Sequence, residues 1–93
     1  MTIRVLIADD HTLLRAGLRV LLDSLDDIEV VGEASDGLMA LRLVEELKPD
    51  ILMTDIGMPG LDGLGLAAAV TRVYPKTRVL ILSMHTESGY TER

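Results

Sequence analysis

The chain has 93 residues, enough for one domain, and 48% of them are hydrophobic but only 2% aromatic, so its core must be aliphatic. A net charge of −6 argues against a surface that grips nucleic acid, because phosphate contacts need clustered lysine and arginine. With no cysteine, no signal-peptide pattern and no apolar run near the roughly 18 to 20 residues of a membrane span, we expect a cytoplasmic domain without disulfides or membrane contact.

Apolar runs of strand length alternate along the chain with segments of helical periodicity. The run from Ile3 to Ala8 is short and nearly continuous, which is typical of a strand covered on both faces. The next segment, His11 to Leu25, has leucines three and four residues apart, which predicts an amphipathic helix. Further strands are predicted at Ile28 to Ala34, Ile51 to Thr54 and Arg78 to Leu82, and further helices at Leu38 to Leu47 and Leu64 to Tyr74.

This alternation predicts the fold class. Short helical crossovers between buried strands require parallel pairing, so we expect an α/β fold with a doubly wound parallel sheet, in one domain over residues 1–93. Four strands and three helices leave one edge and one face of the sheet poorly covered. We therefore interpret the chain as a domain that is shortened at its C-terminal end, and its open edge as a place where two copies could pair.

Three acids fall at the carboxyl ends of predicted strands. Asp9 and Asp10 follow the first strand, and Asp55 follows the third, just before the stretch "IGMPGLDG". Because the strand ends of a parallel sheet meet at one edge, we expect these acids to line one pocket with Ser83, which follows the fourth strand. Clustered carboxylates repel one another unless a cation binds or their pKa values rise, and oxygen ligands favour Mg²⁺. A metal-bound aspartate can also act as a nucleophile and form an aspartyl phosphate.

Each of these residues also has a purely structural interpretation. The adjacent acids could cap the first helix, Asp55 could be a loop acid satisfied by backbone amides, and Ser83 could be ordinary turn chemistry. We predict that His11 begins the first helix near the pocket and is not a ligand, since hard oxygen sites do not need imidazole. Two further acids are interpreted as turn or cap residues of later helices: Asp36 and Asp62.

Three stretches, "VLIADDH", "DILMTDIGMPGLDG" and "VLILSMH", together resemble the receiver domain of two-component response regulators, and most of all its NarL/FixJ type. The resemblance covers essentially the whole chain, and each stretch lies at the end of a predicted strand. It implies a flavodoxin-like receiver fold that takes a phosphoryl group from a sensor histidine kinase. It also implies a parent protein whose helix-turn-helix output domain binds DNA, whereas this chain itself would not.

The resemblance implies a role for each candidate residue. Asp55 would be the phosphoacceptor and would bind Mg²⁺ with Asp10, while Asp9 would act directly or through a water. Gly57 would offer its backbone carbonyl to the metal, and Ser83 would donate a hydrogen bond to a phosphoryl oxygen. The family also carries a lysine after a fifth strand, an aromatic switch residue and a fifth helix. These have no counterpart in the 93 residues, so we expect a longer parent protein to supply them.

Two other functions are alternatives to a phosphoacceptor. An Mg²⁺-dependent phosphohydrolase with an aspartate nucleophile can use a similar fold, but such enzymes need a second acid where this chain has Gly57. The other alternative is an interaction module that is never phosphorylated. We expect a regulatory domain that does not turn over external substrates. Arg15 and Arg19 of the first helix are candidate contacts for a kinase or for a second copy.

Overall fold

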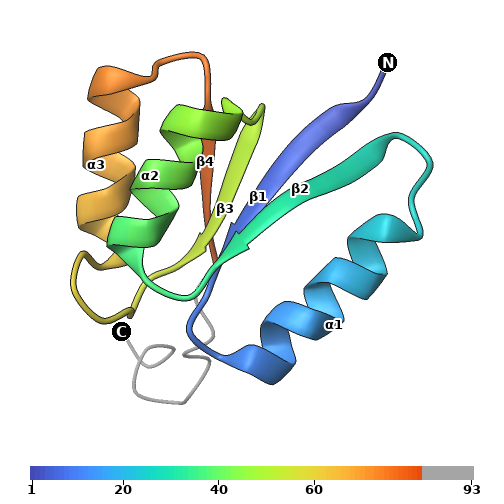
Figure 1. Cartoon of the computed structure of the whole chain (residues 1–93), viewed down its shortest axis with the longest axis horizontal. Coiled ribbons are helices and arrows are strands. Elements are labelled where there is room, and N and C mark those ends of the chain that lie inside the picture. Colours follow the sequence, from blue (N-terminus) through green and yellow to red (C-terminus); the bar gives the residue numbers. More distant parts are fainter. Residues whose placement is uncertain (83–93) are drawn as a thin grey trace, which may run out of the picture.

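The computed structural model describes residues 1–82 of the chain, in which strands and helices alternate (Figure 1). The strands are β1 (Ile3–Ala8), β2 (Ile28–Ala34), β3 (Ile51–Asp55) and β4 (Arg78–Leu82). The helices are α1 (Thr12–Asp23), α2 (Gly37–Leu47) and α3 (Gly63–Val73). None of these helices is long and apolar enough to cross a membrane. The predicted α/β class is confirmed.

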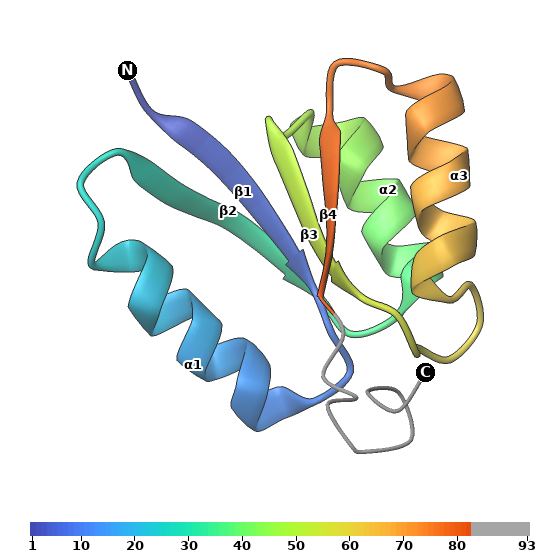
Figure 2. The ribbon, with the colours of Figure 1, turned by 180° about the vertical axis from the view of Figure 1, so that it is seen from behind.

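The sheet has the strand order β2-β1-β3-β4, and all neighbouring strands are parallel. The chain first adds β2 on one side of β1 and then returns to add β3 and β4 on the other side. As a result α1 covers one face of the sheet, and α2 and α3 cover the other (Figures 1 and 2). The change of direction lies between β1 and β3, and ligands of open α/β sheets bind at the carboxyl ends of the strands at such a point.

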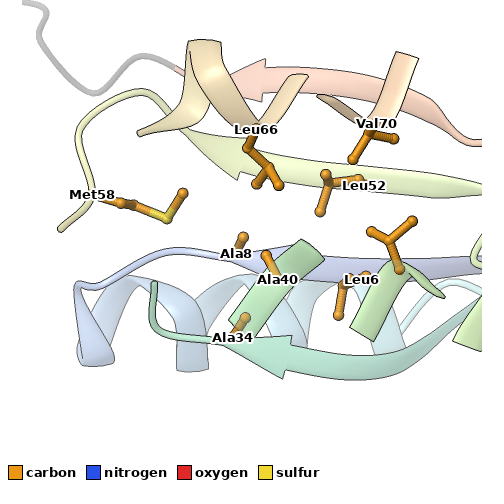
Figure 3. Close-up of a cluster of buried hydrophobic side chains, with 9 residues drawn as sticks. Leu6, Ala8, Ala34, Ala40, Leu52, Met58, Leu66 and Val70 are labelled. Atoms are coloured by element: carbon orange, nitrogen blue, oxygen red, sulfur yellow. The ribbon is translucent and has the colours of Figure 1, made fainter. Parts of the chain in front are cut away.

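Two aliphatic clusters hold the helices to the sheet. On one face, leucines of β1 and β3 pack against residues of α2 and α3 (Figure 3). The buried members of this cluster are Leu6, Ala8, Ala34, Ala40, Val44, Leu52, Met58, Leu66 and Val70. On the other face, Leu22 of α1 packs against Val5, Ile7 and Val30. Because each fully buried valine, leucine, isoleucine or methionine side chain contributes about 1.5–3 kcal/mol, these clusters are the main source of stability.

The face under α1 is covered less completely toward β4. Ile7, Met53 and Leu80 lie in one row across the sheet, because Ile7 pairs with Met53 and Met53 with Leu80. Ile7 is fully buried, whereas Leu80 is 48% exposed on the outermost strand. Within residues 1–82, the poorly covered face and edge expected from the sequence are therefore present.

Strand β2 contains one irregularity that matters for the site. Its register with β1 runs from Val5↔Val30 to Leu6↔Gly32, so Val31 is an extra residue without a partner on β1. Such a bulge changes the face on which all later side chains of the strand point. Glu33 is thereby level with Ile7 and shares the face that α1 covers.

Aspartates begin two of the helices. The Asp36 carboxylate accepts a hydrogen bond from the Met39 N–H at 2.8 Å, and the Asp62 carboxylate accepts one from the Gly65 N–H at 2.8 Å. These bonds satisfy N–H groups that have no partner within the helix. The predicted cap roles of Asp36 and Asp62 are confirmed, and α2 and α3 each begin one residue earlier than predicted.

Helix α1 is shorter than the sequence pattern indicates. It begins at Thr12 and ends at Asp23, two residues before the predicted end at Leu25. The Ser24 hydroxyl donates to the Leu21 carbonyl at 2.6 Å, and the Leu25 N–H donates to the Leu22 carbonyl at 3.0 Å. These short-range bonds tighten and end the last turn, although the leucine spacing continues.

Gly63 allows the start of α3 to lie directly on the end of β3. A Cβ atom at this position would lie 2.1 Å from the Asp55 carbonyl oxygen. The Gly63 N–H also donates to the Ile56 carbonyl at 2.7 Å. Any side chain here would push α3 away from the end of β3 and disturb Asp55.

We expect Gly63→Ala to lower the free energy of unfolding by about 1–3 kcal/mol, because the new methyl group must displace backbone atoms. The matched control is Gly17→Ala in α1, where an added Cβ would meet nothing within 4 Å. That change should raise stability by up to about 1 kcal/mol, since alanine is the better helix former. Urea denaturation followed by circular dichroism measures both effects, and equal effects would contradict the close packing at Gly63.

Candidate metal centre

Four side chains meet at the carboxyl edge of the sheet. One carboxylate or imidazole atom from each lies within 4.8 Å of the others. The four residues are Asp9, Asp10, His11 and Asp55. The first three follow β1, and Asp55 is the last residue of β3, the neighbouring strand. The structure thus brings together the three acids that the sequence placed at strand ends.

Two of the acids are buried. Asp9 is 1% exposed and Asp55 is 3% exposed, while Asp10 lies at the surface. The Asp9 carboxylate accepts a hydrogen bond from the His11 N–H at 2.7 Å, and the Asp55 carboxylate accepts one from the Ile56 N–H at 2.8 Å. These amides orient the carboxylates but do not neutralise them. Buried charges of one sign are costly without a cation nearby.

His11 brings an imidazole ring into this cluster, and the ring carries positive charge when it is protonated. Its Nδ1 atom lies 2.9 Å from an Asp9 oxygen, 3.3 Å from an Asp10 oxygen and 3.6 Å from an Asp55 oxygen. The hydrogen bond to Asp9 raises the pKa of His11 most, followed by the charges of Asp10 and Asp9, while desolvation acts in the opposite direction. The exposed ring thus favours its protonated form.

The sequence placed His11 near the pocket at the start of the first helix, and the structure puts it at that position, just before α1. The prediction missed that its ring contacts all three acids. The only signal in the sequence was the adjacency "DDH", which does not reveal where a side chain points.

The donor set suits a hard divalent cation. Carboxylate oxygens are the ligands that Mg²⁺ prefers, and it usually takes one or two of them and keeps several waters. An imidazole would instead favour a transition metal, but here the Nδ1 atom of His11 is already hydrogen-bonded to the Asp9 carboxylate. The three carboxylates, two of them buried, therefore fit Mg²⁺.

For two predicted site residues, Gly57 and Ser83, the structure of residues 1–82 shows no contact that assigns a role. Gly57 lies in the exposed loop after β3, and an added Cβ there would meet nothing within 4 Å, so no crowding requires glycine. Its expected carbonyl contact to a metal stays a prediction. Ser83 lies outside the described residues, and its expected hydrogen bond to a phosphoryl group stays a prediction as well.

Most of the chain is similar in sequence to known proteins. The model of the response regulator receiver domain family matches residues 5–93. An uncharacterized transcriptional regulatory protein of Bacillus subtilis, YhcZ, is 42% identical over 87 residues, which cover 94% of this chain and 41% of that protein. A Myxococcus xanthus protein-glutamate methylesterase/protein-glutamine glutaminase is 49% identical over 87 residues, or 94% of this chain and 25% of that protein. The chain therefore spans less than half the length of these relatives.

A solved structure shows the same fold. The signal receiver domain of the Mycobacterium tuberculosis response regulator NarL aligns with a TM-score of 0.86 and 45% sequence identity. The alignment covers 95% of this chain and 71% of that one. The parallel sheet and its helices are thus shared with a protein of clearly related sequence.

The contacts of His11 predict its titration. In the metal-free protein we expect the ring to titrate above its ordinary pKa of 6.5, because Asp9, Asp10 and Asp55 favour the imidazolium. A raised pKa in the folded state means that His11 stabilises the fold at low pH, and that this contribution disappears as pH rises through the folded-state pKa. An NMR titration of the ring carbon-bound protons, assigned with a His11→Gln variant, measures the value.

Asp9→Asn should lower the pKa of His11 toward 6.5, since the largest cause of the shift is removed. Asp62→Asn changes an acid that caps α3 and belongs to no contact of His11, so it should leave that pKa unchanged. A wild-type ring that titrates at or below 6.5 would contradict the observed cluster.

Proposed function

Because the chain belongs to the response regulator receiver domain family, which its residues 5–93 match, we propose that it accepts a phosphoryl group on Asp55. The resemblance to receiver domains noted in three short stretches of sequence is confirmed by this match and by the NarL receiver structure. The observation that best supports the role of Asp55 is its place: a nearly buried carboxylate at the end of β3, beside the acid pair of β1.

Asp55 is oriented as a nucleophile by its own strand and loop. One carboxylate oxygen accepts the Ile56 N–H at 2.8 Å, and the other faces His11 at 3.6 Å. A carboxylate oxygen of Asp55 would attack the phosphorus of the donor and form a new P–O bond, while the bond from phosphorus to the donor breaks. The chain contributes the fixed position of the attacking group, which removes orientational freedom before the reaction.

We propose Mg²⁺ as the cation that this site binds. Asp9, Asp10 and Asp55 would hold it, together with the Gly57 carbonyl. The ion would neutralise negative charge on the phosphoryl group during transfer. The support is the donor set itself, three carboxylates that otherwise repel both one another and an incoming phosphate.

The phosphodonor proposed here is a sensor histidine kinase in the cytoplasm, and the output lies in the remainder of a longer parent protein. We propose a DNA-binding output, because several relatives carry names of transcriptional regulators. A methylesterase output is the alternative, since the Myxococcus relative with that name is 49% identical. Pairing of two copies stays a prediction.

The first test is phosphorylation itself. Incubation with acetyl phosphate and Mg²⁺ should add one phosphoryl group to the chain, seen as a mass increase of the intact protein. Asp55→Asn should abolish the increase because the nucleophile is lost. Asp62→Asn is the matched control in the loop that follows Asp55, and it should leave the increase unchanged because Asp62 caps α3.

The outcomes separate the candidate functions. A mass increase that persists in Asp55→Asn would overturn the assignment of the acceptor. Steady release of phosphate from a phosphomonoester would favour a phosphohydrolase. Absence of an adduct, both here and in a parent protein that includes the fifth-strand lysine, would favour a non-phosphorylated interaction module.

The second test concerns the metal. Asp10→Asn should raise the melting temperature in the presence of a chelator, because one of three neighbouring negative charges is removed. At a Mg²⁺ concentration of 100 times the dissociation constant, binding should stabilise the wild type by about 2.7 kcal/mol and so raise its melting temperature. The melting temperature of Asp10→Asn should rise much less. Thermal denaturation with chelator and with Mg²⁺ measures both, with Asp36→Asn of the α2 cap as the control. A Mg²⁺ response equal in all three proteins would rule out the acid cluster as its origin.

A further inference from the structure

We propose that Arg15 is a positioning residue of the metal site: it holds the backbone of Asp9 in place, and Glu33 holds Arg15. The proposal rests on the proposed binding of Mg²⁺ by Asp9, Asp10 and Asp55. It gives a function to an arginine that the sequence suggested only as a contact for a kinase or a second copy.

Arg15 joins three elements of the fold. Its Nη1 group donates to the backbone carbonyl of Asp9 at 2.5 Å, and its Nε group donates to a Glu33 carboxylate oxygen at 2.9 Å. Arg15 lies on α1, Asp9 follows β1, and Glu33 lies on β2. The Arg15 side chain is only 18% exposed, so its guanidinium is mostly committed to these internal contacts.

Glu33 is in turn held by a second arginine. Arg19 Nη1 lies 2.6 Å from the other Glu33 oxygen, so the two carboxylate oxygens bind two arginines one helical turn apart. Hydrogen bonding from Arg19, together with Arg15 and the charges of both, lowers the pKa of Glu33 against the opposing effect of burial. Glu33 thus stays ionised and keeps the Arg15 fork in one orientation.

The contacted carbonyl belongs to the peptide that joins Asp9 to Asp10. The N–H of Asp9 donates to the Ala34 carbonyl of β2 at 3.0 Å, so both backbone groups of Asp9 are bonded to neighbouring elements. Within residues 1–82, the Asp10 carboxylate, by contrast, forms an ion pair with His11 alone, at 3.3 Å. The direction of Asp10 therefore depends on the orientation of the peptide before it, which Arg15 holds.

Arg19 offers a natural comparison. Both arginines lie on α1, carry the same charge and bind Glu33, but only Arg15 reaches the Asp9 carbonyl. A purely structural ion pair would make the two residues equivalent for the site. A positioning role makes them different.

The test compares Mg²⁺ affinity in the wild type, Arg15→Gln and Arg19→Gln, measured by calorimetry with Mg²⁺ alone. Coulomb's law predicts that removal of a positive charge near the acids strengthens cation binding in both variants. The positioning role predicts the opposite sign for Arg15→Gln, which should bind Mg²⁺ about 10-fold more weakly, as happens when groups that orient metal ligands are lost. Arg19→Gln should bind as tightly as the wild type or more tightly.

A second readout separates positioning from chemistry. With acetyl phosphate, Arg15→Gln should need more Mg²⁺ for half-maximal phosphorylation, yet approach the wild-type rate at saturating Mg²⁺, since Arg15 touches no reacting atom. If Arg15→Gln fails to fold, Arg15→Lys tests the positioning role instead, because lysine keeps the positive charge but lacks the planar guanidinium group. Arg15→Lys should also bind Mg²⁺ more weakly than the wild type.

Two results would overturn the proposal, and they differ. If the wild type binds no Mg²⁺, the proposed metal site fails and the role of Arg15 fails with it. If the wild type binds Mg²⁺ and the Arg15 variant that folds binds it as tightly as Arg19→Gln, only the positioning role fails and the metal site stands.

Discussion

The parallel pairing of β1 with β3 is the constraint on which the site depends. In the observed register Ala8 pairs with Thr54, so the next residues lie side by side: Asp9 just beyond β1 and Asp55 as the last residue of β3. A slip by one residue would turn every side chain of one strand to the opposite face. The same register places Leu6 beside Leu52 in the core under α2 and α3. The energy that fixes the register is thus aliphatic burial, and the placement of the acids follows from it.

This arrangement separates the residues that stabilise the fold from the acids of the candidate site. The acids repel one another and are partly removed from water, so they lower stability in the absence of a cation. The two aliphatic clusters offset that cost from the middle of the sheet, away from the strand ends. A local network of hydrogen bonds, from His11, Ile56 and Arg15, then sets the directions of groups that the core only brings near.

The sequence predicted the features that depend on periodicity and on strand ends. The bounds of β1, β2 and β4 agree residue for residue with the prediction. Asp55 extends β3 by one residue because it pairs with Leu82 of β4. The sequence of residues 51–55 alone does not reveal this pairing. The contacts of His11 and Arg15 could not be predicted either: helical spacing indicates a face, but not which carbonyl or carboxylate a long side chain reaches.

The unpaired residue Val31 of β2 determines on which face of the sheet the later residues of that strand place their side chains. If β2 followed β1 without interruption, Glu33 would be level with Ala8 and its charge would enter the aliphatic layer beneath α2. The extra residue instead puts Gly32 on that side, where a Cβ would lie only 2.9 Å from the Leu47 side chain, and leaves the carboxylate to the arginines of α1. One inserted residue thus places the small Gly32 on the crowded aliphatic side of the sheet and the charged Glu33 on the side that α1 covers.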